Sequence, residues 1–143
     1  MATVKKKTRI LVVDDEPMMC SLLDRILTRD GYEVVTAANA DEALAHLRNE
    51  RFGIMISDIK MPGMNGFELL KIVKADYPDT AVIMMTAYGD YFSVKDAMLL
   101  RADEYITKPF RSYDMSMLVD RVYWRLSGEE TRGNPSLTQE TAP

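Results

Sequence analysis

Short apolar stretches of strand length alternate along the chain with longer stretches in which apolar residues recur every three or four positions. The short stretches are rich in branched residues, which favour β-strands. We predict strands over residues 9–13, 33–36, 53–57, 81–85 and 104–106. The longer stretches have the period of amphipathic helices. We predict helices over residues 17–29, 41–49, 66–76, 91–100 and 112–126.

Several predicted helices are bounded by residues that start or stop helices. Asn65 precedes the helix over 66–76 and can accept hydrogen bonds from its free amides, and Asn39 or Ala40 precedes the helix over 41–49. Asp30-Gly31 follows the first helix, and a proline closes the third. These residues support the predicted bounds.

The strict alternation of strands and helices predicts an α/β fold with parallel strands joined by right-handed crossovers. Residues 10–13, 54–56 and 82–85 are apolar throughout, as expected of central strands buried on both faces. The stretches 33–36 and 104–106 are mixed in polarity, so we place them at the edges. The prediction is a flavodoxin-like (βα)5 three-layer sandwich whose five-stranded parallel sheet has the order 2-1-3-4-5.

Length and composition predict how the chain is organised. Its 143 residues correspond to about one domain, which we place at residues 9–126. We expect residues 1–8 to form a flexible basic tail. Residues 127–143 are rich in Gly, Pro, Ser, Thr and Glu, and we expect a disordered tail or a linker truncated from a longer chain.

Charge and cysteine content exclude several classes of protein. A net charge of −4 argues against direct nucleic-acid binding. No apolar run approaches the roughly 20 residues of a membrane span, so we expect no membrane insertion. The single cysteine, Cys20, rules out an intramolecular disulfide and fits a reducing cytoplasm, where we expect the protein to be located.

Acidic residues follow two of the predicted central strands. Asp14, Asp15 and Glu16 come directly after the first, and Asp58 follows the third. The carboxyl ends of neighbouring parallel strands meet at one edge of the sheet, where unpaired carboxylates would repel one another. A hard divalent cation such as Mg²⁺ would relieve this repulsion. The alternative for Asp14 and Asp15 is capping of the helix that starts near Pro17, although one acid suffices for a cap.

The ends of the last two predicted strands add a hydroxyl group and a cation. Thr86 lies at the end of the fourth strand, and Lys108 follows the fifth. Taken alone, Lys108 could form a structural salt bridge with the acids. Together these groups match what phosphoryl transfer to an aspartate requires, because metal, hydroxyl and ammonium can each stabilise one oxygen of the transferred group.

With these residues, the sequence resembles the receiver domain of bacterial two-component response regulators. The resemblance covers about residues 8–126 and is carried by residues 12–17, 57–66, 86–87 and 103–110. It implies a signalling domain that catalyses only its own phosphotransfer and dephosphorylation. Asp58 would accept a phosphoryl group from a sensor histidine kinase or a histidine phosphotransfer protein.

The resemblance also implies a role for each site residue. Asp15, Asp58 and the backbone carbonyl of Lys60 would bind Mg²⁺, or Mn²⁺ in its place, and Asp14 would hold a metal-bound water. Thr86 would close onto the phosphoryl group and Lys108 would pair with it.

Family members usually have a cis bond before the proline at the position of Pro109, and Tyr105 matches their aromatic switch residue. The helix over 91–100, the strand over 104–106 and the helix over 112–126 would form the output surface. That surface would bind a downstream protein, an effector domain missing from this chain or a second copy in a homodimer. The family commonly has glycine where this chain has Arg101, which puts the end of the preceding helix in doubt.

Three alternatives compete with this interpretation. A magnesium-dependent phosphatase would usually need a second acid two residues after Asp58, where this chain has Lys60. A flavin-binding module would need a Ser-, Thr- and Gly-rich loop after the first strand, where the acids would repel its phosphate. A scaffold that is never phosphorylated would not need all five of the site residues.

Overall fold

A computed structural model describes residues 8–87, 95 and 99–130 of the chain. Its five parallel strands form one sheet in the order β2-β1-β3-β4-β5, which confirms the predicted order. The strands are β1 (Arg9–Val13), β2 (Glu33–Ala37), β3 (Ile54–Asp58), β4 (Ala81–Ala87) and β5 (Glu104–Lys108). Most of the helix predicted over 91–100, and most of both predicted tails, lie outside the described residues.

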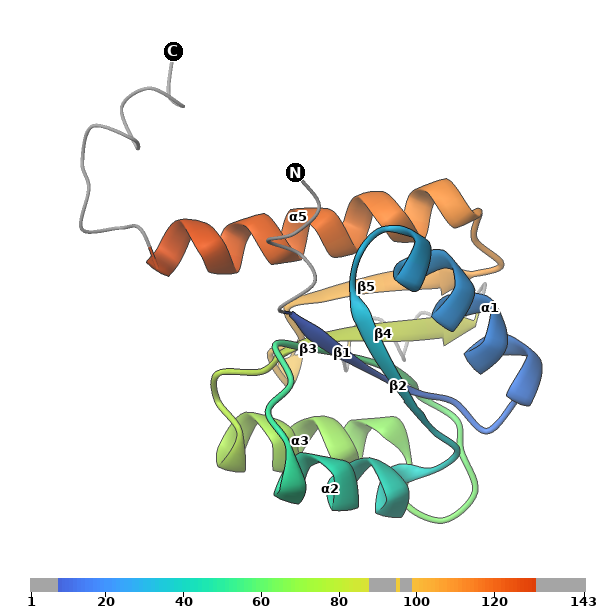
Figure 1. The fold of residues 1–143 in the computed structure, drawn as a ribbon. Helices are drawn as coiled ribbons and strands as arrows, with labels where there is room; N and C mark the ends of the chain where they lie inside the picture. The colour runs from blue at the N-terminus through green and yellow to red at the C-terminus, as the bar shows by residue number, and fades with distance from the viewer. Residues whose placement is uncertain (1–7, 88–94, 96–98, 131–143) are drawn as a thin grey trace.

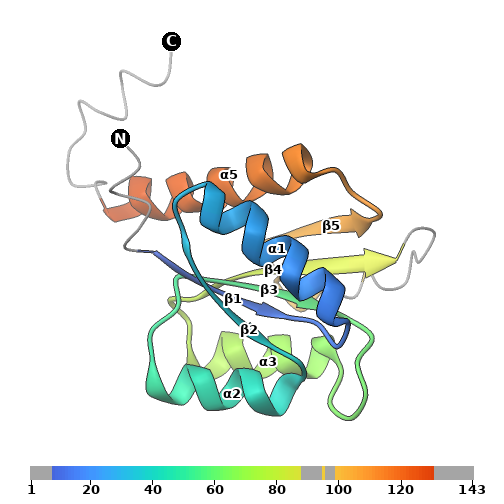
Figure 2. The same cartoon turned by 45° about the vertical axis from the view of Figure 1, so that its right-hand side comes forward.

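Helices cover both faces of the sheet. The helices are α1 (Pro17–Arg29), α2 (Ala40–Asn49), α3 (Gly66–Asp76) and α5 (Ser112–Glu130). Figures 1 and 2 show α1 and α5 on one face and α2 and α3 on the other, so the predicted three-layer α/β sandwich is confirmed. None of the described helices is long and apolar enough to cross a membrane.

The central strand β1 shows why the sheet needs helices on both faces. Ile10, Leu11, Val12 and Val13 are all fully buried. Because neighbouring side chains point to opposite faces, Ile10 and Val12 join the core under α1 and α5, whereas Leu11 and Val13 join the core under α2 and α3. The continuous apolar stretch in the sequence is thus shared between two cores.

The predicted asparagine caps are present in the structure. The Asn39 side chain accepts a hydrogen bond from the Glu42 amide at the start of α2. At the start of α3, the Asn65 side chain accepts from the Glu68 amide while the Glu68 carboxylate accepts from the Asn65 amide, which makes a capping box. Both caps stabilise helices that follow loops near the carboxyl ends of strands.

Strands β2 and β3 each end one residue later than predicted, and three other elements extend further beyond their predicted ends. Strand β4 continues to Ala87 and β5 to Lys108, because Thr86 pairs with Thr107 and Ala87 with Lys108 in the parallel ladder. Helix α5 continues to Glu130, past the boundary expected at residue 126. Ser127 and Gly128 are weak helix formers, but no proline interrupts the helix there.

Polar contacts hold α5 on two sides, and we call them the α5 anchor. Toward α1 and β2, the Tyr32 hydroxyl donates to Asp120 at 2.6 Å and the Ser116 hydroxyl donates to Asp30 at 2.6 Å. Toward β5, Glu104 accepts from two guanidinium groups. The donors are Arg121 at 3.3 Å and Arg125 at 2.6 Å.

Candidate functional site

The acids predicted from the sequence meet at the carboxyl edge of the sheet. Strands β1 and β3 are neighbours, with Val13 paired to Ser57, so Asp14 follows β1 next to Asp58 at the end of β3. Carboxylate oxygens of Asp14, Asp15 and Asp58 all lie within 4.8 Å of one another. Asp14 is buried, Asp58 is partly buried and Asp15 is exposed. This arrangement confirms that the strand ends bring the three aspartates together.

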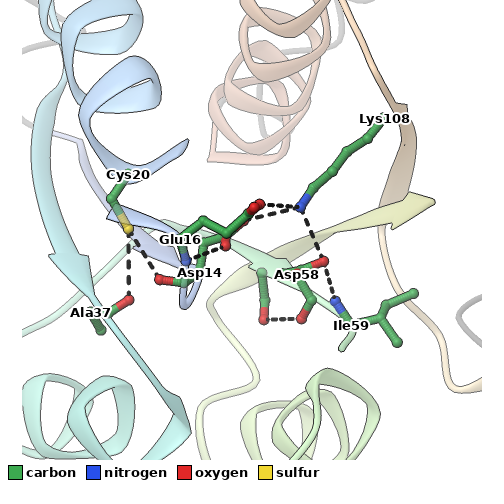
Figure 3. Close-up of polar contacts among 8 residues, drawn as sticks. Asp14, Glu16, Cys20, Ala37, Asp58, Ile59 and Lys108 are labelled. Carbon is green, nitrogen blue, oxygen red and sulfur yellow. Dashed lines mark hydrogen bonds and ion pairs between the residues drawn. The ribbon is translucent and has the colours of Figure 1, made fainter. Parts of the chain in front are cut away.

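Lys108 crosses the neighbouring strand end to reach these acids. Its ammonium nitrogen Nζ lies 3.2 Å from Asp14 Oδ2, 3.3 Å from Asp58 Oδ1 and 3.9 Å from Glu16 Oε1. Figure 3 shows the ammonium between these carboxylates. The Lys108–Pro109 peptide bond is cis, as the family resemblance implied.

Neither Asp14 nor Asp15 occupies the cap position of α1. The cap residue is Glu16, whose side chain makes no capping hydrogen bond, and Pro17 begins the helix. Asp14 Oδ1 instead accepts a 2.9 Å hydrogen bond from the Glu16 backbone amide, which fixes the carboxylate at the sheet edge. The alternative of simple helix capping is therefore wrong for both aspartates.

The electrostatics of the cluster leave negative charge uncompensated. Burial raises the pKa of Asp58, and the nearby charge of Asp14 adds to this rise, while Lys108 opposes it. Burial lowers the pKa of Lys108, but the carboxylates of Asp58 and Asp14 outweigh it and leave that pKa above its usual value. One ammonium thus stabilises several carboxylates incompletely, and the site favours a further cation.

The donor set fits a hard divalent metal ion. Among the described residues, the cluster offers three carboxylates within reach of one ion. Carboxylate, carbonyl and water oxygens are the ligands of Mg²⁺, and Mn²⁺ accepts the same set. The thiol of Cys20 does not join them, because its Sγ lies 3.3 Å from the Asp14 backbone carbonyl, to which it donates. Lys60 lies in the turn after β3 with its side chain exposed.

The backbone around Asp58 depends on two residues for which we predicted no role. The Ser57 hydroxyl is buried and donates to the Asp58 carbonyl at 2.9 Å. A Cβ atom at Gly66 would lie 2.2 Å from the same carbonyl oxygen, so only glycine lets α3 approach this closely. A glycine at the first position of a helix, directly after its cap, is the one signal that marks this contact in the sequence.

The predicted switch residues lie on β4 and β5. Thr86 is buried, and its Oγ1 lies 3.5 Å from Thr107 Oγ1. Tyr105 is 40% exposed and pairs with Met84, so its side chain lies on the same face of the sheet as that of Thr86. The structure therefore places the two residues on one face of neighbouring strands.

Arg101, which stands where the family commonly has glycine, has a φ of 70°. This left-handed conformation is disfavoured for residues with a Cβ atom by about 1–2 kcal/mol. Two residues later, Asp103 accepts hydrogen bonds from Lys74 at 2.5 Å and from the Val82 amide at 2.7 Å. The chain thus makes the turn that glycine would make, and Asp103 fastens it to α3 and β4.

Comparison with known proteins gives consistent matches. The response regulator receiver domain family matches residues 10–121. The response regulator protein FleR of Pseudomonas aeruginosa is 36% identical over 130 residues, which are 90% of this chain and 28% of that protein. The heme response regulator HssR of Staphylococcus saprophyticus is 34% identical over 136 residues, which are 92% of this chain and 60% of that protein. The chain thus spans less than two thirds of the length of these relatives.

A solved structure agrees with the sequence matches. The response regulator TrrA from Thermotoga maritima, in complex with Mg²⁺ and BeF, is 37% identical with a TM-score of 0.73. The match covers 80% of this chain and 98% of that one. Likeness in sequence and in fold therefore extends over most of the chain, and the residues that the family matches, 10–121, include the acidic edge of the sheet.

Proposed function

Because the chain belongs to the response regulator receiver domain family, we propose that it is a switch whose state is set by phosphorylation of Asp58. Family membership makes it a signalling domain of two-component systems. The observation that carries the proposal is the position of Lys108. Its ammonium lies 3.3 Å from Asp58 and 3.2 Å from Asp14, where it can stabilise a phosphoryl group on Asp58.

In the proposed reaction, a carboxylate oxygen of Asp58 attacks the phosphorus atom of a phosphohistidine. The donor is a sensor histidine kinase or a histidine phosphotransfer protein. The new O–P bond forms as the P–N bond breaks, and the imidazole nitrogen keeps the electron pair of the broken bond. The domain acts on no other substrate and also catalyses the later hydrolysis of its own aspartyl phosphate.

The surrounding residues stabilise the transferred group. Asp15, Asp58 and the Lys60 carbonyl would bind Mg²⁺ or Mn²⁺, with Asp14 holding one of its waters, and the ion would neutralise charge on the phosphoryl oxygens. Lys108 supplies a second positive charge, and the Thr86 hydroxyl supplies a hydrogen-bond donor to a third oxygen. Buried Asp14 keeps its place through the Glu16 amide.

Thr86 and Tyr105 would transmit the effect of phosphorylation from Asp58 to the surface of the domain. Contact of Thr86 and Lys108 with the phosphoryl group favours one of two conformations, and Tyr105 changes its position between them. The proposed output surface would include β5 and α5 together with the segment 91–100, most of which lies outside the described residues. On α5 it exposes three large apolar residues, Tyr113 at 69%, Met117 at 53% and Trp124 at 56%.

We propose that this surface binds a downstream protein or an effector domain, or pairs with a second copy of the chain. The chain spans only part of the length of its relatives, so the output could lie in another domain. We propose no direct contact of this domain with nucleic acid and a cytoplasmic location, consistent with its net charge of −4 and single cysteine.

The test is incubation with acetyl phosphate or with beryllofluoride, with and without Mg²⁺, followed by intact mass and amide NMR. We expect a gain of one phosphoryl group that requires Mg²⁺ and is lost in Asp58→Asn. The matched control is Asp24→Asn on α1, which should be modified like the wild type. Magnesium binding without any modification or spectral change would contradict the proposal and favour a scaffold.

A further inference from the structure

Glu16 places a carboxylate beside the site that no structural role explains. It holds the cap position of α1, yet its side chain makes no capping hydrogen bond. The side chain is 68% exposed, so it contributes little to packing. Its Oε1 lies 3.9 Å from Lys108 Nζ, and Figure 3 shows it on the same side of the ammonium as Asp14. This carboxylate is therefore available to Lys108.

Lys108 and a divalent cation compete for the same oxygens. The ammonium lies 3.2 Å from Asp14 and 3.3 Å from Asp58, two of the three acids in the cluster that fits a metal ion. Like charges repel at these distances, so an ion bound to the aspartates drives the ammonium away. Lys108 nevertheless has to stay near Asp58 to meet an incoming phosphoryl group.

We infer that Glu16 is a positioning residue that holds the Lys108 ammonium at the edge of the site when a divalent cation takes over Asp14 and Asp58. This inference rests on the proposed function. With Glu16 as an alternative partner, Lys108 gives up the aspartates more easily, so the cation binds more tightly. The Glu16 carboxylate is exposed to solvent, so we expect the effect on affinity to be about two- to fivefold.

The test compares Mg²⁺ binding by the wild type and by Glu16→Gln, measured by calorimetry and by NMR of the lysine side-chain ammonium groups. We expect weaker binding by Glu16→Gln and, in the wild type alone, a Lys108 ammonium signal that stays slowed in exchange with water after Mg²⁺ is added. The matched control is Glu33→Gln, which removes the same charge from an exposed ion pair with Arg9 at the opposite end of the sheet.

The same comparison in a Lys108→Met variant distinguishes a role of Glu16 through Lys108 from a general effect of its charge on Mg²⁺ binding. In Lys108→Met there is no ammonium to hold, so Glu16→Gln should change Mg²⁺ affinity by less than about twofold. Equal losses in both backgrounds, or no loss in either, would overturn the inference. If the wild type itself binds no Mg²⁺, the proposed function fails as well, whereas normal binding and phosphorylation in every Glu16 variant refutes only the role of Glu16.

Discussion

The acidic edge of the sheet and the α5 anchor use charge in opposite ways. At the acidic edge one ammonium, that of Lys108, lies near the carboxylates of Asp14, Glu16 and Asp58. In the α5 anchor one carboxylate, that of Glu104, accepts from two guanidinium groups.

This difference indicates which of the two regions responds to ligands. The acidic edge has fewer positive charges than carboxylates, and water cannot fully solvate the buried ones. A cation that binds there therefore stabilises the folded protein. The arginines of the anchor are largely exposed, and water solvates their excess charge. The first arrangement responds to ligands, whereas the second holds a helix in place.

The largest expected effect comes from Gly66→Ala, which disrupts only the acidic edge. The added Cβ would lie 2.2 Å from the carbonyl oxygen of Asp58 and 2.8 Å from the Cα of Ile59, and both of these are backbone atoms. We expect a loss of about 3 kcal/mol in the free energy of unfolding, measured by urea denaturation. Gly128→Ala is the control, because a Cβ there meets nothing within 4 Å and should leave stability the same or slightly higher.

Tyr32→Phe tests the anchor instead. It removes the 2.6 Å hydrogen bond to Asp120 and leaves the ring contact with Tyr123, whose centroid lies 5.8 Å away. We expect a loss of about 1–2 kcal/mol near neutral pH with Mg²⁺ affinity unchanged. A change in Mg²⁺ affinity would mean that the two regions are not independent.

The Tyr32→Phe substitution should also change how the stability of the protein depends on pH. Burial and the bond to Asp120 raise the pKa of Tyr32, so the folded protein keeps the phenol proton at pH values where the unfolded chain loses it. The stability contributed by this group is complete below the unfolded pKa of about 10 and is lost as pH rises above it. Thermal denaturation should therefore show the wild type losing stability above pH 10 more steeply than Tyr32→Phe.

Asp58→Asn should stabilise the protein at neutral pH in the absence of divalent cations. Burial and the charge of Asp14 raise the pKa of Asp58, so its ionised form is disfavoured in the folded state. Stability tied to this group is present below its unfolded pKa of about 3.9 and is lost as pH rises through the folded value. We expect a gain smaller than the loss in Tyr32→Phe.

The advantage of Asp58→Asn should vanish in acid and reverse when Mg²⁺ is added, because the cation stabilises the wild type more than the variant. Thermal denaturation at several pH values, with and without Mg²⁺, measures this. A variant less stable than the wild type at neutral pH without metal would show that Lys108 compensates the acids fully, contrary to the comparison.

The smallest expected effect is that of Glu104→Gln. It weakens the contacts to Arg121 and Arg125, but both arginines remain solvated. We expect a loss of about 0.5 kcal/mol that shrinks in high salt. A loss as large as that of Tyr32→Phe would show that the arginine contacts, and not the tyrosine, hold α5.

The sequence predicted the fold because its strongest signals are local. Apolar stretches, helical periods and the caps at Asn39 and Asn65 depend on neighbouring residues, and the alternation of elements limits the possible topologies. The meeting of Asp14 with Asp58 followed from strand order alone, because parallel strands bring their carboxyl ends to one edge.

Other features depend on distances between elements, which no local pattern encodes. The contact of Glu16 with Lys108 joins α1 to β5, and the approach of Gly66 to Asp58 depends on how α3 packs. The left-handed turn at Arg101 is a third case. An arginine carries no local signal for that turn, and the contacts of Asp103 with α3 and β4 accompany it.

The position of Trp124 makes it an intrinsic fluorescent probe of the surface of α5. It is the one tryptophan in the chain, it lies on α5 with 56% of its surface exposed, and its ring meets that of Tyr123 edge-on at 5.0 Å. Indole emission moves to shorter wavelength when water leaves the ring. Fluorescence excited at the tryptophan band therefore reports whether a partner covers this helix, without any attached dye.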